Sequence, residues 1–430
     1  MTAPYKIGIA GLGTVGASVV RILQEQSDDI FLKTGRQVEI VSVSARDKTA
    51  DRDCDLSNIT WCDDLLSDMA EDSSLDCIVE LIGGEDGIAY DLVKKALGRG
   101  ISVITANKAL LAHHGKELAT LAEKNNVHLR YEAAVAGAIP VVKALREGLS
   151  INNVQNVYGI LNGTCNYILT EMEKTGRDFD DVLTEAQDKG YAEADPSFDI
   201  DGHDTGHKIS LLSALAFSMF PAFEDIEIRG IRAITQTDIS YASELGYRIK
   251  LLGAARFGSQ GVEQSVEPCL VPLDRPIASV NDSMNAVYIQ TNYADETLMV
   301  GRGAGGDETA SAVIADIIDL MRAQGVPVFG RQADRLSEPQ LANMNMRVIS
   351  VYVRLVVEDK PGVFADIASQ LSKFDLSIKS ALQHSEITKG IVPVILVLRD
   401  VRVENLNGAL QAIEKMKAVK ETPFYMRIMD

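Results

Sequence analysis

Residues 199–208 read DIDGHDTGHK and are followed at once by the apolar segment ISLLSALAF. Such a concentration of titratable side chains could carry acid–base chemistry. Asp204 and Lys208 are four residues apart, which is the spacing of an ion pair on one face of a helix. Acidic residues near a helix N-terminus are also favoured by the helix dipole, so solvated acids are the simpler interpretation of this segment. Any chemical role for it depends on the rest of the chain.

A glycine motif near the N-terminus points to a second kind of chemistry. An apolar strand pattern at 6–10 precedes it, and a helical pattern with Val19, Val20 and Leu23 on one face follows. In this context the first glycine permits a tight turn, the second leaves room for a pyrophosphate and the third lets helix and strand pack closely. Free amides at the helix N-terminus then face the anion. We expect a dinucleotide to bind at Gly11, Leu12, Gly13, Thr14, Val15 and Gly16.

The end of the second predicted strand, VEIVSVSARDK at 38–48, bears on which nicotinamide cofactor fits. An acidic residue there would hold the ribose hydroxyls of NAD, whereas a basic residue suits the 2′-phosphate of NADP. This strand ends with Arg46, and Lys48 follows, although Asp47 lies between them. The pattern favours NADP. NAD is the alternative cofactor, and two solvated bases on a loop are the structural alternative.

Two further strands are predicted, LDCIVELIGG from residue 75 and ISVITANK from residue 101, with the helix YDLVKKALGRG between them. Strand, helix and strand at this spacing predict a Rossmann-like, doubly wound parallel sheet, so the fold class is α/β. Ligands bind such sheets at the carboxyl ends of the strands. Gly83, Gly84 and residues 105–108 would then line the nicotinamide end. Taken alone, Lys108 could equally be an ordinary surface lysine.

Composition limits the remaining classes of function. The 430 residues predict roughly three domains, and no apolar run reaches the ~18 residues of a membrane helix. The formal charge of −19 opposes binding to nucleic acids. The N-terminal sequence has no signal-peptide features, so we expect a cytoplasmic protein. The five cysteines form no Cys-x-x-Cys pair and are expected to be buried, reduced thiols.

The C-terminal part is expected to be a separate unit after a polar, loop-like linker at 331–348. From residue 349 the sequence predicts strand, helix, strand, strand, helix and strand, with a turn at 359–362. This order is similar to that of an ACT domain, a ferredoxin-like module that binds small regulatory ligands. An oligomerisation domain without a ligand is the alternative, because a sheet with helices on one face commonly packs against a copy of itself.

Several motifs together resemble those of homoserine dehydrogenases. In chain order they are GLGTVG, TANKALL, YEAAVAGAIPV, LNGTCNYIL, GYAEADPSFDIDGHDTGHK and GRGAGGDETASAV, and they span residues 5 to about 330. The resemblance implies NAD(P)-dependent, reversible interconversion of L-homoserine and L-aspartate 4-semialdehyde, in threonine, methionine and isoleucine biosynthesis. It implies a dinucleotide-binding domain at 1–131 completed by about 306–330, an α+β substrate-binding, catalytic and dimerisation domain at 132–305, and an ACT domain at 349–430.

The resemblance also assigns roles to individual residues. It places proton transfer on Lys208, one helical turn after Asp204, with Lys108 as a second active-site lysine that contacts substrate and cofactor. It directs Glu193 and Asp199 to the substrate's ammonium group, where more than one carboxylate is needed to replace the lost water contacts. The remaining implied contacts are Asn162, Gly163 and Thr164 near the substrate and nicotinamide, and Gly303 where the chain returns to the cofactor.

The segment EAAVAGAIP at 132–140 is similar to a monovalent-cation site of some family members. The implied ligands of this structural ion, for example sodium, are the Glu132 carboxylate and the carbonyls of Val135, Gly137 and Ile139. Carbonyl ligands leave no side-chain signature in a sequence, so a turn of small residues is the alternative.

The C-terminal unit is expected to bind an amino-acid effector, threonine above all, and to lower activity from a distance through pairing of modules between subunits. A homodimer or homotetramer is therefore predicted, with neither nucleic acid nor membrane as a partner. A catalytically silent amino-acid sensor and a different amino-acid dehydrogenase are the two rival functions. The presence of Lys108, Asp204 and Lys208 argues against the silent sensor.

Overall fold

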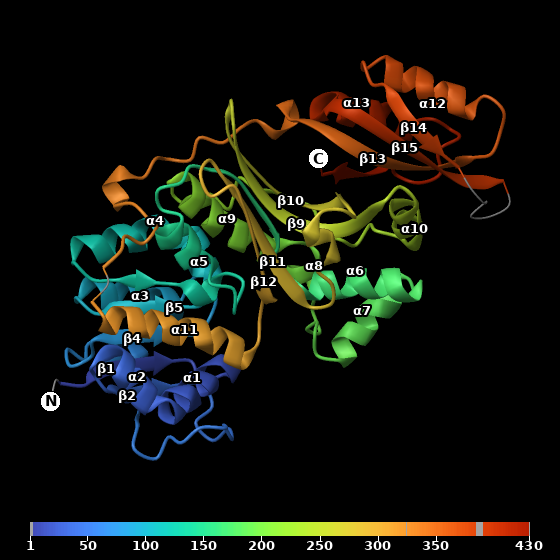
Figure 1. Cartoon of the computed structure of the whole chain (residues 1–430). Coiled ribbons are helices and arrows are strands. Elements are labelled where there is room, and N and C mark those ends of the chain that lie inside the picture. The colour runs from blue at the N-terminus through green and yellow to red at the C-terminus, as the bar shows by residue number, and fades with distance from the viewer. Residues whose placement is uncertain (1–2, 324, 384–389, 430) are drawn as a thin grey trace.

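The computed structural model describes residues 3–323, 325–383 and 390–429, so the outermost residues of the first and last predicted domains lie outside it. The chain forms an elongated molecule (Figure 1). An N-terminal unit, blue to cyan, lies at one end, and the C-terminal unit, in red, lies at the other. The green and yellow central unit joins them.

The N-terminal unit is built on a parallel sheet. Over the described residues it has six strands in the order β3-β2-β1-β4-β5-β6. The strands are β1 (Tyr5–Ala10), β2 (Val38–Ser44), β3 (Thr60–Trp61), β4 (Cys77–Glu80), β5 (Ser102–Thr105) and β6 (Leu129–Arg130). Strands β4 and β5 are buried along their whole length, as expected of a parallel sheet covered on both faces. The predicted doubly wound sheet is confirmed.

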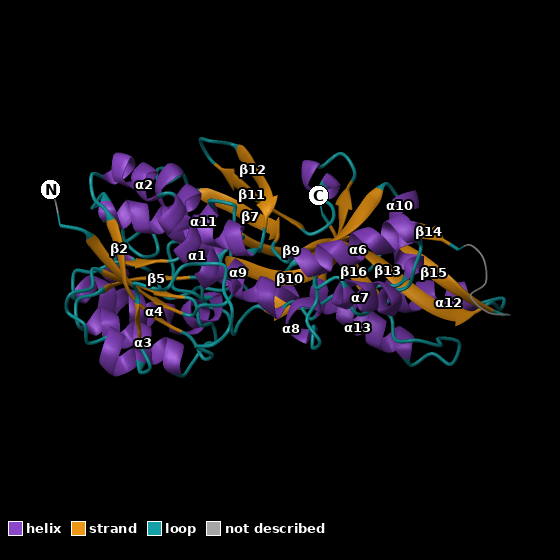
Figure 2. Cartoon of the chain, turned by 90° about the horizontal axis from the view of Figure 1, so that it is seen from below, coloured by secondary structure: helices purple, strands orange, loops and turns teal. Residues whose placement is uncertain are grey.

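Helices cover both faces of this sheet (Figure 2). On one face lie α1 (Thr14–Glu25), α2 (Ser27–Thr34) and α11 (Gly306–Met321), and on the other lie α3 (Ile88–Gly98) and α4 (Lys108–Lys124). The alternation of β1 divides its side chains between the two cores, with Ile7 and Ile9 packed toward α1 and α11, and Ala10 on the opposite side. Helix α11 follows the central unit in the sequence, so the chain returns to the N-terminal core after it has formed that unit.

The central and C-terminal units share a second sheet. Its order over the described residues is β12-β11-β7-β9-β10-β16-β13-β15-β14, and β8 pairs with β10 outside this path. The strands are β7 (Val154–Ile160), β8 (Glu227–Ile228), β9 (Tyr247–Gly258), β10 (Gly261–Pro272), β11 (Met284–Thr291), β12 (Glu296–Arg302), β13 (Val348–Glu358), β14 (Ile378–Leu382), β15 (Ile391–Arg402) and β16 (Phe424–Ile428).

Several helices of these two units, among them α6, α9 and α10, pack on that sheet. The helices of the two units are α5 (Val141–Lys143), α6 (Gly163–Thr175), α7 (Phe179–Asp188), α8 (Ser197–Ile200), α9 (His203–Phe217), α10 (Gln236–Glu244), α12 (Val363–Ser372) and α13 (Val403–Glu414). Short helical turns along the described chain are η1 (Leu65–Met69), which lies in the N-terminal unit, η2 (Glu132–Ala134), η3 (Ala144–Gly148), η4 (Pro276–Ser279), η5 (Ala333–Arg335) and η6 (Met344–Met346). Helix α9 is buried on all sides from Asp204 to Leu215, which explains why its sequence is apolar with little periodicity.

The C-terminal unit has the predicted order β13-α12-β14-β15-α13-β16. Its attachment to the central unit was not predicted. Strand β16 pairs in parallel with β10 through two residue pairs, so the two units form one continuous sheet. Beside this junction the buried carboxylate of Glu267 accepts from Arg347 at 2.7 Å. The expected linker also contacts the central unit, through bridges that join Ser337 to Met219 and Leu341 to Val262.

All five cysteines are free, and four of them are buried, as predicted. Cys54 departs from the prediction because it is only partly buried. None of the helices in the described part of the chain is both long enough and apolar enough to cross a membrane.

Candidate active site

Asp204 lies at the centre of a cluster of charged side chains. Helix α9 begins after Gly202, whose φ of +95° is a left-handed conformation suited to glycine, and this places Asp204 in the first helical turn. Asp204 is 5% exposed. Its Oδ2 lies 2.7 Å from Nζ of Lys208, and its Oδ1 lies 3.1 Å from Nζ of Lys108. One buried carboxylate therefore holds both lysines that the sequence singles out.

Local structure fixes the two lysines. Lys108 is the first residue of α4, and the side chain of Asn107 caps that helix by accepting from the amide of Leu110 at 3.1 Å. The Asn107 amide also donates to the carbonyl of Gly84 at 2.6 Å, which ties the helix start to the loop after β4. Lys208 donates to the carbonyl of Leu161 at 2.7 Å in addition to its bond with Asp204.

Asn162 joins the two aspartates of the cluster. Its Oδ1 accepts from the amide of Cys165 and thereby caps α6. Its Nδ2 donates to Asp199 at 2.7 Å and to Asp204 at 2.8 Å. The capping bond fixes which end of the amide faces the carboxylates. The motifs placed Asn162 near the nicotinamide, but nothing in the sequence indicated this bridge, because Asn162 is 37 residues away from Asp199 in the chain.

The charges in the cluster shift one another's pKa values. Burial opposes ionisation of Asp204, but the nearby lysine ammonium groups and its hydrogen bonds outweigh burial and hold its pKa well below the ordinary value. The Asp204 carboxylate in turn raises the pKa of Lys108 against the effect of burial. Burial, followed by the charge of Asp204, raises the pKa of Asp199. The cluster thus holds a firmly ionised acid beside one that binds its proton more tightly.

The other residues predicted to contact the substrate border this cluster. Gly163 begins α6, and a Cβ there would lie 2.7 Å from the carbonyl of Ser283, so no larger residue fits without a backbone shift. The hydroxyl of Thr164 donates to the carbonyl of Tyr191 at 2.7 Å. Glu193 is exposed, and its negative charge helps to raise the pKa of Lys108. The structure does not bring its carboxylate into the hydrogen-bonded cluster of Asp204.

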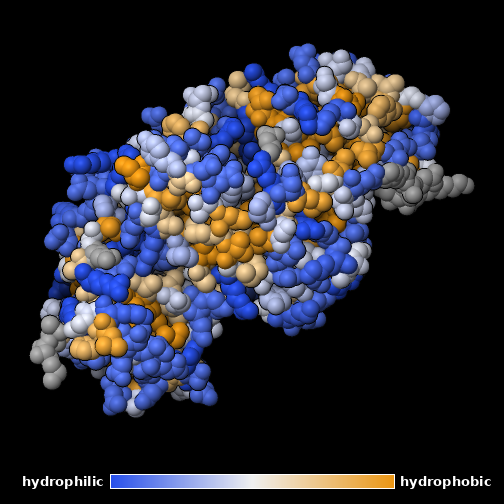
Figure 3. Space-filling view, in the orientation of Figure 1, coloured by the Kyte–Doolittle hydropathy of each residue, from blue (hydrophilic) through white to orange (hydrophobic). Residues whose placement is uncertain are grey.

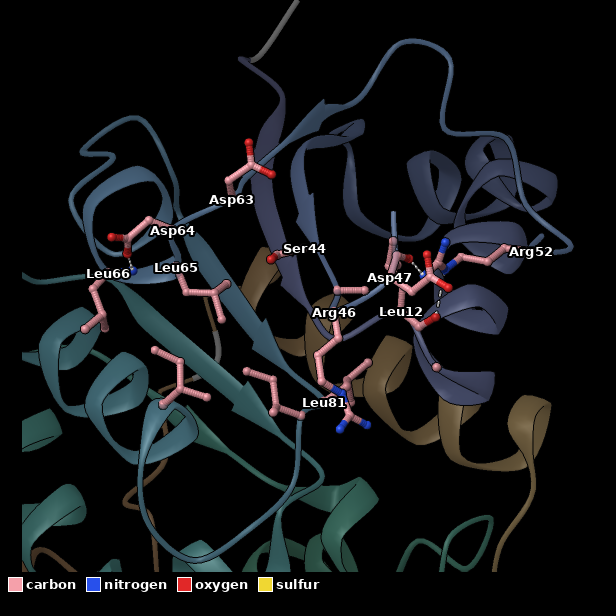
Figure 4. Close-up of a pocket in the computed structure, with 15 residues that line it drawn as sticks. Leu12, Ser44, Arg46, Asp47, Arg52, Asp63, Asp64, Leu65, Leu66 and Leu81 are labelled. Carbon is pink, nitrogen blue, oxygen red and sulfur yellow. Dashed lines mark hydrogen bonds between the residues drawn. The ribbon is translucent and has the colours of Figure 1, made fainter. Parts of the chain in front are cut away.

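The predicted dinucleotide loop borders a cavity of about 810 Å³ at the carboxyl ends of β1, β2 and β4 (Figure 4). Gly11 has a φ of +103°, and a Cβ there would lie 2.6 Å from the carbonyl of Leu81. A Cβ on Gly16 would lie 2.0 Å from the carbonyl of Gly11, so this glycine permits the close contact between helix and strand. Gly13 instead faces open space, which leaves room for a ligand against the backbone.

Arg46 projects from the end of β2 into this cavity, toward Leu81 (Figure 4). Its guanidinium has no hydrogen bond or ion pair with the described residues, so it presents free donors to the cavity. The Asp47 carboxylate is not free to hold a ribose hydroxyl, because it accepts hydrogen bonds from the backbone amide and the hydroxyl of Thr49. Arg52 also lines the cavity and donates to the carbonyl of Leu12 at 3.0 Å, although no sequence pattern indicated it.

The predicted cation ligands lie in a buried loop. Both oxygens of Glu132 accept backbone hydrogen bonds, from Val142 at 3.0 Å and Lys143 at 2.8 Å. Each carboxylate oxygen has a second lone pair, so these bonds leave acceptor capacity for an ion. A Cβ on Gly137 would lie 2.6 Å from the carbonyl of Gly303, which shows how closely this loop approaches the returning chain. A carboxylate with free acceptor capacity is a ligand that suits a hard cation such as sodium.

Comparison with known proteins agrees with this organisation. Successive parts of the chain match the homoserine dehydrogenase NAD-binding domain at residues 11–132, homoserine dehydrogenase at 140–318 and the ACT domain at 351–417. Homoserine dehydrogenase of Pseudomonas aeruginosa is 42% identical over 432 residues, which cover 99% of each chain. A crystal structure of homoserine dehydrogenase from Thiobacillus denitrificans matches at 39% identity and a TM-score of 0.92, covering 99% of this chain and 98% of that one.

A hyperthermophilic archaeal homoserine dehydrogenase in complex with NADPH covers 75% of this chain and 99% of its own, at 30% identity and a TM-score of 0.65. The nucleotide-binding sheet and the lysine–carboxylate cluster together define an NAD(P)-dependent oxidoreductase. The matches extend over nearly the whole length, and the chain belongs to the homoserine dehydrogenase family. It interconverts L-homoserine and L-aspartate 4-semialdehyde, and it carries an ACT domain, a module that binds amino-acid effectors. The family resemblance found in the motifs is confirmed.

Proposed function

We propose that Lys208 is the proton donor of semialdehyde reduction and that NADP is the preferred cofactor. The observation that carries the first part is the position of the Lys208 ammonium, 2.7 Å from Asp204 and 2.7 Å from the carbonyl of Leu161. Two acceptors fix Nζ and leave its third proton free to be transferred. Lys208 is also 8% exposed, so water competes little with the substrate for that proton.

When bound beside the substrate, a reduced nicotinamide would supply the hydride that the aldehyde carbon receives. The carbonyl oxygen gains negative charge, and Lys208 protonates it: a new O–H bond forms as an N–H bond of the ammonium breaks. Asp204 holds Lys208 in position throughout this step. The ammonium of Lys108, on the other oxygen of Asp204, contacts the substrate and adds positive charge beside the developing alkoxide. In the oxidation of homoserine the neutral Lys208 amine takes the hydroxyl proton.

Asp199 and Glu193 receive the substrate's ammonium group in this proposal. Asp199 is held by Asn162 at the edge of the cluster, and Glu193 approaches from an exposed loop. Two carboxylates replace more of the ammonium's lost water contacts than one could. Gly163 and Thr164, in the first turn of α6, complete the surface that the substrate contacts.

The preference for NADP rests on Arg46. Its free guanidinium in the cavity beside the glycine loop is suited to bidentate contact with a 2′-phosphate. The archaeal relative in complex with NADPH supports this choice. The backbone of Gly11, Leu12, Gly13, Thr14, Val15 and Gly16 would receive the pyrophosphate, with Lys108 and Gly303 toward the nicotinamide.

We propose that the ACT domain binds threonine. We also propose that the chain forms a homodimer or homotetramer. Hydrophobic side chains gather over β11 and β12 in the middle of one face (Figure 3). Strand β12 is an edge of the described sheet, and its Val300 is 50% exposed. An exposed apolar strand at a sheet edge is suited to contact with a second copy.

We also propose a structural sodium ion on Glu132 and the carbonyls of Val135, Gly137 and Ile139.

Replacement of Lys208 tests the proton route. Lys208→Ala should lower kcat for semialdehyde reduction by about two orders of magnitude or more, the range of general acid catalysis, with little change in NADPH affinity. Lys208→Arg, which keeps the charge and binds its proton too tightly to transfer it, should lose comparable activity. If Lys208→Ala retains more than about a tenth of wild-type turnover, another group donates the proton.

A further inference from the structure

Three side chains with metal-binding atoms meet beside the lysine cluster. The ligating atoms of Glu85, His113 and His207 all lie within 4.8 Å of one another. Glu85 belongs to the loop after β4, His113 to α4 and His207 to α9. Because the fold brings them together from three separate elements, their proximity is not a consequence of sequence spacing. None of the three has a role in the proposed hydride and proton transfers.

His207 is the unusual member of this group. It is 3% exposed, and neither of its ring nitrogens has a hydrogen-bond partner among the described residues. Its ring packs against Phe223, with 4.1 Å between the centroids, and against His113, with 5.4 Å between them. Burial of a polar nitrogen without a partner is unfavourable, so a side chain of this kind is suited to receive a ligand.

His113 lies between two carboxylates. Its Nε2 is 3.1 Å from Oε2 of Glu85, and its Nδ1 is 3.1 Å from Oε1 of Glu224. Metal-bound histidines commonly present one ring nitrogen to the ion and the other to a carboxylate, which orients the ring. Glu224 is placed for that second role, while Glu85 and Nε2 of His113 face the same space.

We propose that Glu85, His113 and His207 form a binding site for a divalent transition-metal ion of the zinc type. Two imidazoles and one carboxylate are ligands that zinc accepts, and three protein ligands leave a position for water. The Glu85 side chain is 53% exposed and the Glu224 side chain 78% exposed, so an ion can enter from solvent. The charge of Lys108 acts on His207, and the carboxylates of Glu85, Glu224 and Asp204 offset it.

The proposed ion would link the two halves of the active site. Helix α4 carries both His113 and Lys108, and α9 carries both His207 and Lys208. An ion bound to the two histidines therefore joins the nucleotide-binding unit to the central unit, next to Lys208 in α9 and five residues from Lys108 in α4. This site is separate from the proposed sodium loop at 132–139 and independent of the proposed proton route.

Cobalt(II) is a suitable probe, because the ion binds to zinc sites and absorbs visible light when its coordination is tetrahedral. The full-length protein, stripped of metal with a chelator, should bind one cobalt ion per chain with visible d–d bands, and zinc should displace it. His113→Asn and Glu85→Gln should each weaken binding by about tenfold or more, and Glu224→Gln by about tenfold through its contact with His113.

The neighbouring pair His114 and Asp86 supplies matched controls. Nε2 of His114 lies 2.8 Å from Oδ1 of Asp86, on the same helix and the same loop as the proposed ligands. His114→Asn and Asp86→Asn should keep wild-type cobalt affinity. Zinc should raise the Tm of the wild type and of these controls, but not that of His113→Asn. Absence of d–d bands, equal binding by His113→Asn, or equal losses in the controls would each overturn the proposal.

Discussion

The amide of Asn162 donates to the carboxylate of Asp204 at 2.8 Å, on the same oxygen that receives Lys208 at 2.7 Å. A neutral donor and a charged donor therefore share one acceptor inside the protein. The same amide also donates to Asp199, so a single side chain keeps two carboxylates close together without requiring either to be protonated. Burial of such a pair would otherwise be costly.

Replacement of Asn162 should show this dependence in the stability of the protein. Asn162→Ala removes the cap of α6, worth about 1 kcal/mol, and takes one hydrogen bond from Asp204 and one from the half-buried Asp199, each worth about 0.5–1.5 kcal/mol. Urea unfolding at pH 7 measures the loss. Asn162→Asp keeps an acceptor for the helix cap but adds a third carboxylate, so its loss should shrink as the pH is lowered. Wild-type stability of both variants would mean that the bridge contributes nothing.

Arg46 gives the cleanest test of cofactor choice. Arg46→Ala should weaken NADPH binding by about tenfold to a hundredfold, because a charged hydrogen bond is worth about 1.5–3 kcal/mol, and should leave NADH binding almost unchanged. Lys48→Ala is the matched control, since the ammonium of Lys48 lies over the Trp61 ring, 5.5 Å from its centroid, rather than in the cavity. Dissociation constants from fluorescence titration decide the question. Equal losses for both cofactors in Arg46→Ala would contradict the proposed contact.

Much of the architecture was predictable because it depends on local patterns. Strand β1, the glycine turn and the buried face of α1 follow one another within twenty-one residues, and each has a signature in the sequence. The junction of β10 with β16 leaves no such signature, because it pairs segments that are far apart in the chain. The same holds for the site: the Asp204–Lys208 pair is local, whereas the contact of Lys108 with Asp204 depends on how two units pack.

Glu132 makes the stability of the protein depend on pH. Burial, followed by the charge of Asp316, raises the pKa of Glu132 from 4.5 to about 7. The folded state therefore binds this proton more tightly than the unfolded state, so this residue's contribution to stability is full below pH 4.5 and falls as the pH rises toward 7. The loss is at most about 1.4 kcal/mol per pH unit. Urea unfolding across this range should show a smaller decline for Glu132→Gln than for the wild type.

The same variant tests the proposed sodium ion. At pH 8 the Glu132 carboxyl is largely ionised, and a bound cation would offset its burial. Sodium chloride should then raise the Tm of the wild type above the value in choline chloride at equal ionic strength, and Glu132→Gln should show no difference between the two salts. A response of both proteins to sodium would place the ion elsewhere.

The contact between Tyr352 and Asp238 should carry part of the regulation that we propose for the ACT domain. The hydroxyl of Tyr352, on β13, donates to the fully buried carboxylate of Asp238, at the start of α10, at 2.9 Å. Arg354 donates to the same oxygen at 3.0 Å, and the other oxygen accepts from the amide and hydroxyl of Thr235, so both carboxylate oxygens keep donors when the tyrosine hydroxyl is removed.

Tyr352→Phe should therefore fold and keep basal activity, because the ring is retained and the reacting residues lie in another part of the central unit. Its inhibition by threonine should require about tenfold more threonine than inhibition of the wild type, which is within the usual range of coupling between sites.

Truncation before residue 345 is the less precise test, because it also removes the β16–β10 pairing and leaves Glu267 without Arg347. Initial rates of semialdehyde reduction against threonine concentration measure the effect. Unchanged inhibition in Tyr352→Phe would mean that another contact between the two units carries the coupling. If threonine, methionine and isoleucine all fail to inhibit the wild-type enzyme, the C-terminal unit serves in assembly and not in regulation.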